Sequence, residues 1–145
     1  MIKVKIKKLN SRALIPERMT SNAAGYDIYS ANSADISLKP GTLELVPTGI
    51  ALSLPAGYEA QIRPRSGMAI DHQLGILNSP GTIDSDYRGE VKIILFNFSK
   101  DEYVLKPGTR IAQMVINHHE TADFIEVKDL DKTRRGNGGF GHTSS

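Results

Sequence analysis

The segment VKIILFNF at residues 91–98 has apolar side chains on both faces, with only Lys92 and Asn97 as polar exceptions. A short, continuous apolar run of this kind is typical of a fully buried strand. The turn-forming residue Gly89 precedes the run, and a polar segment follows it. We therefore expect Val91–Phe98 to form a central strand that is covered on both sides, and this strand to organise the fold around it.

Other short apolar runs surround this segment, most of them separated by Gly, Pro, Asn or Asp. Residues 2–6 alternate apolar side chains with lysines, which predicts a half-solvated edge strand. The remaining runs lie at residues 26–29, 43–46, 50–54, 58–62, 103–105, 111–116 and 124–127. No stretch of about 12 residues has helical periodicity, although residues 66–71 could form one helical turn. The pattern predicts an all-β, antiparallel single domain, as a sandwich, barrel or jelly roll.

Composition limits the chemistry that this chain can perform. Its 145 residues fit one domain within the usual range of roughly 100–200. Because there is no cysteine, disulfides, thiolate zinc sites, iron–sulfur clusters and cysteine nucleophiles are excluded. A net charge of +2 and the absence of tryptophan indicate no nucleic-acid partner.

The N-terminal sequence also bears on location. MIKVKIKK lacks the apolar stretch of roughly 7–15 residues that a signal peptide needs. No apolar run along the chain is long enough for a membrane-spanning helix. We therefore expect a soluble, cytoplasmic protein without a membrane partner.

The composition changes near Lys128, where the sequence becomes KDLDKTRRGNGGFGHTSS. We expect residues 1–127 to form the β-domain and residues 128–145 a flexible arm that becomes ordered when something binds it. The arm contains GNGGFG at Gly136–Gly141, a match to the dinucleotide fingerprint. That fingerprint needs a strand before it and a helix after it, and neither is predicted here. Two interpretations of Gly136–Gly141 remain: a glycine loop whose backbone N–H groups can wrap a phosphate, or a disordered tail.

Two further segments group residues that could bind a phosphate or activate a water. The first, at residues 63–67, reads RPRSG and combines guanidinium, hydroxyl and backbone N–H groups that suit a polyphosphate; a solvated turn is the alternative. The second spans residues 78–90 and holds three carboxylates around a predicted turn, where they could bind a metal, activate a water or cap the turn. Adjacent His118 and His119 point to opposite faces of a strand, so no metal site is expected there.

Five blocks in order make the chain resemble the trimeric deoxyuridine triphosphatases (dUTP pyrophosphatases) of the bacterial type. These blocks are AGYDIYSA at 24–31, RPRSGMAI at 63–70, LNSPGTIDSDYRGEV at 77–91, PGTRIAQMVI at 107–116 and RGNGGFGHTS at 135–144. The resemblance implies a jelly-roll subunit or distorted barrel and a homotrimer with active sites between subunits. It also implies a Mg²⁺-dependent conversion of dUTP to dUMP and pyrophosphate, which limits uracil incorporation into DNA and supplies dUMP for thymidylate synthesis.

The family roles imply which residues carry the reaction. Asp84 would hold and deprotonate the water that attacks the α-phosphorus, as a positioned carboxylate can do. Asp27 would hold Mg²⁺ through the waters bound to the ion, with the substrate phosphates as its main ligands. Gln113 would help to fix the water and Asp84.

Phosphate binding is implied at two places. Arg65, Ser66 and the backbone of Gly67 would contact the phosphates. Arg135 and the glycine loop, including Gly141, would close over the distal phosphates, while Phe140 would lie on the uracil face. The arm would then act as a lid that excludes water from the site.

Specificity is implied by the hairpin at Asn78–Tyr87. The Asn78 amide and the backbone of Gly81, Thr82 and Ile83 would imitate a pairing partner for uracil, leaving unmatched hydrogen bonds with cytosine. Tyr87 would pack on the sugar and exclude a 2′-hydroxyl. Lys92 would add a backbone contact from the strand that follows.

Three other functions compete with this interpretation. A dCTP deaminase-like enzyme shares the fold, but residues 77–91 match a uracil-binding block and the arm has the arginine and glycines of the lid. A non-catalytic nucleotide sensor would not need Asp84 and Arg135. An RNA-binding tail would depend on a single Arg-Gly step and a net charge of only +2.

Overall fold

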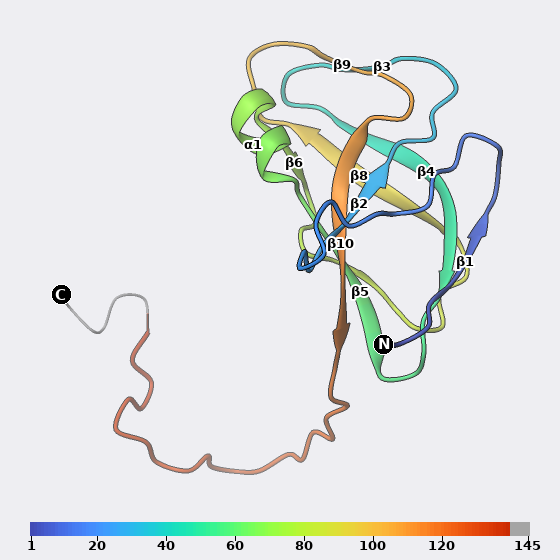
Figure 1. Cartoon of the computed structure of the whole chain (residues 1–145). Helices are drawn as coiled ribbons and strands as arrows, with labels where there is room; N and C mark the ends of the chain where they lie inside the picture. Colours follow the sequence, from blue (N-terminus) through green and yellow to red (C-terminus); the bar gives the residue numbers. More distant parts are fainter. Residues whose placement is uncertain (140–145) are drawn as a thin grey trace.

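The computed structural model describes residues 1–139 (Figure 1). Within them the chain forms ten strands and one short helix, and every strand pair is antiparallel. The elements are β1 (Lys5–Lys8), β2 (Tyr26–Tyr29), β3 (Ile36–Leu38), β4 (Leu43–Ser53), β5 (Tyr58–Arg63), α1 (Ser66–His72), β6 (Leu74–Ile76), β7 (Gly81–Ile83), β8 (Glu90–Asn97), β9 (Tyr103–Leu105) and β10 (Arg110–His118). The predicted all-β class is confirmed.

The strands form two four-stranded sheets and one short pair. The first sheet has the order β1-β4-β8-β6, the second has the order β2-β10-β5-β7, and β3 pairs with β9. One continuous apolar core contains residues from both four-stranded sheets, among them Val46 and Ile93 from the first and Ile28 and Ile62 from the second. Figure 1 shows β3 and β9 together at one end of the molecule, beyond α1.

Strand β8 lies between β4 and β6, as an interior strand should, but it is not covered on both sides. Val91, Ile93 and Leu95 are buried, whereas Ile94 and Phe96 on the other face are only half-buried. The predicted burial of both faces is therefore wrong for the single chain. The outer face is apolar but has no layer packed over it within the described residues.

Three local predictions also need correction. The separate runs at 43–46 and 50–54 form one strand, β4, with an irregular register between Pro47 and Ala51 that Gly49 allows through its φ of +67°. The segment 78–87 is not a two-stranded hairpin, because β7 pairs with β5 in the other sheet. Helix α1 is longer than the single turn expected.

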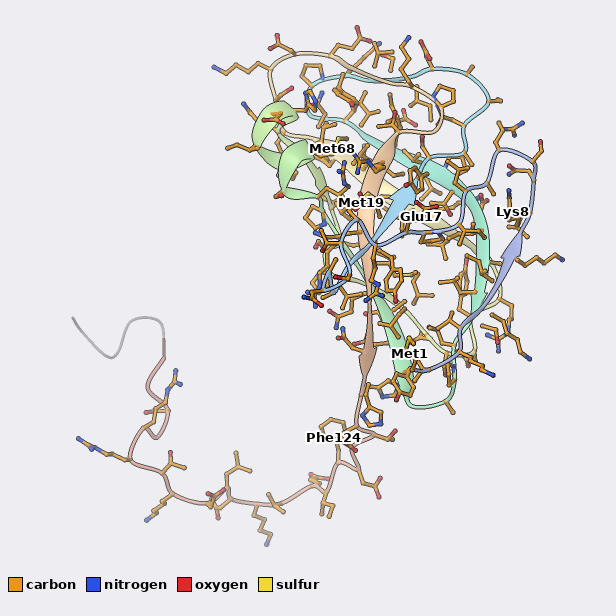
Figure 2. The ribbon with its side chains drawn as sticks, viewed as in Figure 1. Met1, Lys8, Glu17, Met19, Met68 and Phe124 are labelled. Atoms are coloured by element: carbon orange, nitrogen blue, oxygen red, sulfur yellow. The ribbon has the colours of Figure 1, made fainter. Side chains whose placement is uncertain are left out.

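Residues 119–139, which follow β10, extend away from the body without regular secondary structure (Figure 1). The predicted strand at residues 124–127 is wrong for the single chain, since Phe124 and Ile125 are 96% and 83% exposed. Figure 2 shows Phe124 on the extended segment that follows β10, beyond the strands. Within residues 1–139 no strand pairs with this segment, although its sequence is apolar.

Among the described residues, no helix is long and apolar enough to cross a membrane.

Candidate active site

Five of the predicted site residues lie around one cavity of about 200 Å³. It is lined by Met19, Asp27, Arg65, Ser66, Gly67, Arg110 and Gln113. Met19 and Arg110 were not predicted from the sequence. The signal for Arg110 was available, because it is the one charged residue in the strand that follows the Pro107-Gly108 turn.

Strand pairing places these residues together. Gln113 on β10 is directly opposite Asp27 on β2 and, on its other side, opposite Arg63 at the end of β5. Residues directly opposite in an antiparallel pair share one face of the sheet. Arg65 and Ser66 follow two residues later, where the chain leaves β5 and begins α1. The cavity therefore forms between β2, the first half of β10 and the turn that leads from β5 into α1.

Asp27 is enclosed by two guanidinium groups. Its Oδ1 lies 3.4 Å from Arg65 Nε, and its Oδ2 accepts a hydrogen bond from Arg110 Nη1 at 3.1 Å. Arg65 Nη1 donates to the backbone oxygen of Arg110 at 3.0 Å, which joins the three residues into one network. Two positive groups and one negative group leave a net charge of +1 beside the cavity, which favours an anion.

Gln113 is held by a backbone acceptor and a glycine. Its Nε2 donates to the carbonyl oxygen of Pro64 at 2.9 Å. A Cβ built on Gly25 would lie only 2.4 Å from Gln113 Oε1, so the amide occupies the space that a side chain at position 25 would need. The absence of a side chain at Gly25 therefore fixes where the Gln113 amide can lie.

The predicted base-binding residues lie on a different part of the same sheet. Strand β7 is an edge strand, paired only with β5 among the described residues, so the outer side of Gly81–Ile83 is open. The Asn78 amide packs on Gly81, where a Cβ would lie 3.0 Å from Asn78 Nδ2. Polar backbone groups on an open edge are free to bind another molecule.

The loop between β7 and β8 is fixed by contacts around Glu90. Tyr87 Oη donates to the backbone oxygen of Glu90 at 3.0 Å, and Gly49 N donates to Glu90 Oε1 at 2.8 Å. The Lys92 side chain is exposed and lies 3.7 Å from Glu90 Oε2. A Cβ on Gly89 would lie 2.3 Å from Tyr87 Oη, so the ring also depends on that glycine.

Asp84 is not brought to the cavity within one chain. It follows Ile83, which is opposite Ala60 on β5, whereas Gln113 is opposite Arg63. Asp84 and Gln113 are thus separated by two strand spacings and about four residues along the strands. At about 3.4 Å per residue and 4.8 Å per strand, this is a Cα separation of about 16 Å, too far for both side chains to hold one water.

Arg135 also lies away from the cavity, on the extended arm. Its Nε donates to the carbonyl oxygen of Gly138 at 2.8 Å, and the N–H of Gly138 donates to the Arg135 carbonyl oxygen at 3.1 Å, so the two residues form a local turn. Phe140 and Gly141 lie outside the described residues. The structure therefore separates the predicted site residues into three parts: the cavity, the β7 loop and the arm.

Comparison with known sequences gives one consistent match. A family model described as dUTPase matches residues 11–144. A deoxyuridine 5′-triphosphate nucleotidohydrolase from Syntrophotalea carbinolica is 49% identical over 142 residues, which cover 98% of this chain and 97% of that protein. The protein of the same name from Rickettsia felis is 52% identical over 141 residues, covering 97% and 95%.

Comparison with solved structures supports the same fold. The dUTPase of Staphylococcus bacteriophage 80alpha with dUpNHpp superposes with a TM-score of 0.89 at 29% identity and 99% coverage of both chains. A mutant dUTPase from phage phi11 of S. aureus, described with a structural Mg(II) ion, gives a TM-score of 0.80 at 25% identity, covering 88% of this chain and 98% of that one. The jelly-roll-like fold expected from the sequence is confirmed.

Proposed function

Since this chain belongs to the dUTPase family, we propose that it hydrolyses dUTP to dUMP and pyrophosphate at the bond between the α- and β-phosphates. The observation that carries the proposal is the cavity in which Arg65, Ser66, Gly67 and Gln113 meet beside a net positive charge. The reaction would limit uracil incorporation into DNA and supply dUMP for thymidylate synthesis. The cytoplasmic location stays a prediction.

The cavity suits the triphosphate. The first N–H groups of a helix have no acceptor within the helix, and here Ser66 and Gly67 open α1 beside the Arg65 guanidinium. Backbone donors and a guanidinium together match the oxygens of a phosphate chain. A shorter, apolar ligand would leave these backbone and guanidinium donors without a partner, so it would not suit the cavity.

The β7 edge suits the base and the sugar. Gly81–Ile83 offer backbone donors and acceptors on the open side of the strand, and Asn78 adds an amide next to Gly81. Uracil would pair with these groups, whereas the 4-amino group of cytosine would place a donor where an acceptor is needed. A mismatch of this kind can discriminate by roughly 10⁴–10⁵. Tyr87, held by its hydrogen bond to Glu90, would pack on the deoxyribose and exclude a 2′-hydroxyl.

Asp84 would act as the general base. It is exposed at the end of β7, where its carboxylate can accept a proton from a water in line with the α-phosphorus. Because Asp84 and Gln113 of one chain are about 16 Å apart, we infer that the water is held between Asp84 of one copy and Gln113 of another. The arm, with Arg135, the glycine loop and Phe140, would close over the bound nucleotide.

Several apolar side chains support an assembly of copies. The outer face of the first sheet has half-buried or exposed residues on β4 and β8, and it continues into the residues just beyond β6 and β8. These are Leu43, Leu45, Leu77, Ile94, Phe96 and Phe98, of which Leu45 and Phe98 are 55% and 59% exposed. Contiguous exposed apolar patches mark interaction surfaces. We propose a homotrimer in which this face is covered, with the active sites between subunits.

We propose that Mg²⁺ enters the site bound to the phosphates of the substrate. Residues 1–139 contain no cluster of three His, Cys, Asp or Glu side chains that could hold a metal directly. Asp27 fits a hydrated ion, because a carboxylate accepts about four hydrogen bonds and its oxygens face only one guanidinium each. Asp27 would hold such an ion through water, and the bound ion would offset negative charge on the phosphates.

The experiment is pyrophosphate release from dUTP, dCTP, dTTP and UTP with Mg²⁺, together with ammonia release from dCTP. Turnover of dUTP alone is expected. Equal rates with dTTP or UTP would refute the proposed base and sugar recognition. Ammonia release from dCTP would indicate a deaminase instead, and binding without turnover would indicate a nucleotide sensor.

A further inference from the structure

Arg110 reaches the cavity because β10 contains a bulge. Ala112 is opposite Ile28 and Gln113 is opposite Asp27, but the register then shifts so that Arg110 is opposite Tyr29. In a regular strand, Arg110 would share the buried face of Ala112. The extra residue instead turns Arg110 to the face of Asp27 and Gln113.

The bulge also leaves the core intact. Ile111, the extra residue, is 1% exposed, and Ala112 is fully buried. Strand bulges next to active sites often redirect one side chain while the strand continues. Here the redirected side chain is an arginine at the wall of a cavity that already contains Arg65.

Most of the Arg110 guanidinium is free to bind something else. Its single hydrogen bond within the described residues is Nη1 to Asp27 Oδ2, while an arginine has five N–H donors. The Arg110 side chain is 42% exposed, whereas that of Asp27 is only 13% exposed beneath it. The guanidinium is thus more exposed than the carboxylate that it contacts, and its other four N–H donors make no hydrogen bond within the described residues.

Building on the proposed function, we propose that Arg110 is a further phosphate-binding residue of the cavity and that Asp27 is a positioning residue that holds Arg110 and Arg65 as a pair. Asp27 contacts one nitrogen of each guanidinium, and Arg65 is tied in addition to the Arg110 carbonyl oxygen. Two planar guanidinium groups fixed side by side match the oxygens of adjacent phosphates.

Binding of inorganic tripolyphosphate, measured by calorimetry in EDTA, tests Arg110 without metal, base or turnover. Arg110→Gln should weaken binding by about 10- to 100-fold, since hydrogen bonds to charged groups are the strong ones. Arg110→Lys keeps the positive charge but loses the planar guanidinium. Its affinity for tripolyphosphate should therefore lie between those of the wild type and Arg110→Gln. Arg18→Gln is the matched control: Arg18 donates to Ser21 and lies over the Tyr26 ring, outside the cavity, so its loss should leave affinity unchanged.

Asp27→Asn separates positioning from binding. The variant removes one negative charge, so tripolyphosphate should bind at least as tightly as to the wild type. Arg110→Gln should nevertheless weaken tripolyphosphate binding less in the Asp27→Asn background than in the wild type, because Arg110 is no longer held beside Arg65. An equal loss in both backgrounds, measured in EDTA and therefore without the Mg²⁺ that Asp27 would hold, would overturn the positioning role of Asp27.

Unchanged tripolyphosphate affinity in Arg110→Gln, or an equal loss in Arg18→Gln, would overturn the role of Arg110. If Arg110→Gln does not fold, Arg110→Lys decides, and wild-type affinity in that variant would overturn the proposal. Failure of the wild type to bind tripolyphosphate would do the same. Wild-type protein that binds tripolyphosphate through Arg110 but releases no pyrophosphate from dUTP would refute the proposed function and leave this inference standing.

Discussion

Gly25→Ala should impair catalysis far more than folding. Gly25 precedes β2, and a Cβ at this position would lie 2.4 Å from Gln113 Oε1 and 3.3 Å from its Cδ. The atoms in conflict belong to the end of a flexible side chain, so the Gln113 amide moves and the backbone stays. The substitution therefore displaces Gln113 without altering its chemistry.

The displacement can be estimated from the distances. To move from 2.4 Å to an ordinary contact of 3.4 Å, Gln113 Oε1 must retreat by about 1 Å. The shift also strains the bond from Gln113 Nε2 to the Pro64 oxygen, and one such hydrogen bond contributes about 1 kcal/mol to stability. A misplacement of 1 Å can cost about 100-fold in rate, or about 2.7 kcal/mol of barrier.

The assay compares kcat for dUTP with the free energy of unfolding in urea. Gly41→Ala is the matched control, because Gly41 has a φ of +70° and nothing within 4 Å of an added Cβ. It should lose about 1–2 kcal/mol of stability from backbone strain and keep the wild-type kcat. Gly25→Ala should show the reverse: a small loss of stability and a large loss of kcat.

A double mutant tests whether Gly25→Ala acts through Gln113. If Gly25→Ala acts through Gln113, adding it to Gln113→Ala should cause no further loss of kcat. A wild-type kcat in Gly25→Ala would refute the role of the Gln113 position. Fully additive losses in the double mutant would show that Gly25 acts through another group.

Four other predictions follow from the β7 loop, the arm and the titratable groups. Gly89→Ala should push the Tyr87 ring from its place, since an added Cβ would lie 2.3 Å from Tyr87 Oη, and should raise the rate on UTP relative to dUTP in a competition assay. Asp84→Asn should retain dUTP binding in calorimetry but lose turnover by about 100-fold or more, because the general base is gone; wild-type turnover would remove Asp84 from the mechanism. Deletion of residues 135–145 should leave the β-domain folded by circular dichroism and severely reduce kcat, whereas full activity would rule out the lid. Burial raises the pKa of the Tyr103 phenol above its ordinary 10.0, so the folded state disfavours the phenolate. The free energy of unfolding should therefore fall as the pH rises above about 10. Tyr103→Phe should remove this loss in unfolding curves measured at alkaline pH.

The strand order could be anticipated only in part from the sequence. Tyr26–Tyr29 and Tyr103–Leu105 were predicted with their observed bounds, because each is a short apolar run between turn residues. Strands β3 and β6 escaped notice, since a small residue, Ser37 or Gly75, interrupts each of these short apolar runs at its centre. The single strand β4 was predicted as two runs because Pro47, Thr48 and Gly49 interrupt its apolar pattern, and its continuity is visible only in its pairing with β1 and β8.

The outer face of β8 shows how an interface can resemble a core in sequence. Ile94 and Phe96 made the strand look buried on both sides, and the single chain leaves that face partly open. The same ambiguity applies to Phe124, which is apolar in sequence and exposed in the segment between β10 and the arm. Apolar residues that one copy does not cover are expected where a second copy packs.

The site was predictable as a set of residues but not as an arrangement. The sequence blocks identified Asp27, Arg65 and Gln113, and the structure brings them to one cavity. Arg110 was missed although it is the one charged residue of its strand, because its place beside Asp27 depends on the bulge in β10. The distance between Asp84 and Gln113 likewise follows from strand order, which is a property of the whole sheet.

Complementation between two inactive variants tests most directly the central claim that dUTP is hydrolysed at a site completed by two copies. Asp84→Asn and Arg65→Ala should each be inactive, and co-refolding them in equal amounts should restore dUTP-specific pyrophosphate release. About one quarter of the wild-type rate is expected, because a cyclic assembly of randomly mixed copies pairs two intact halves at one interface in four. If the mixture stayed as inactive as its components while the wild type hydrolysed dUTP, the site would lie within one chain and the account would be contradicted.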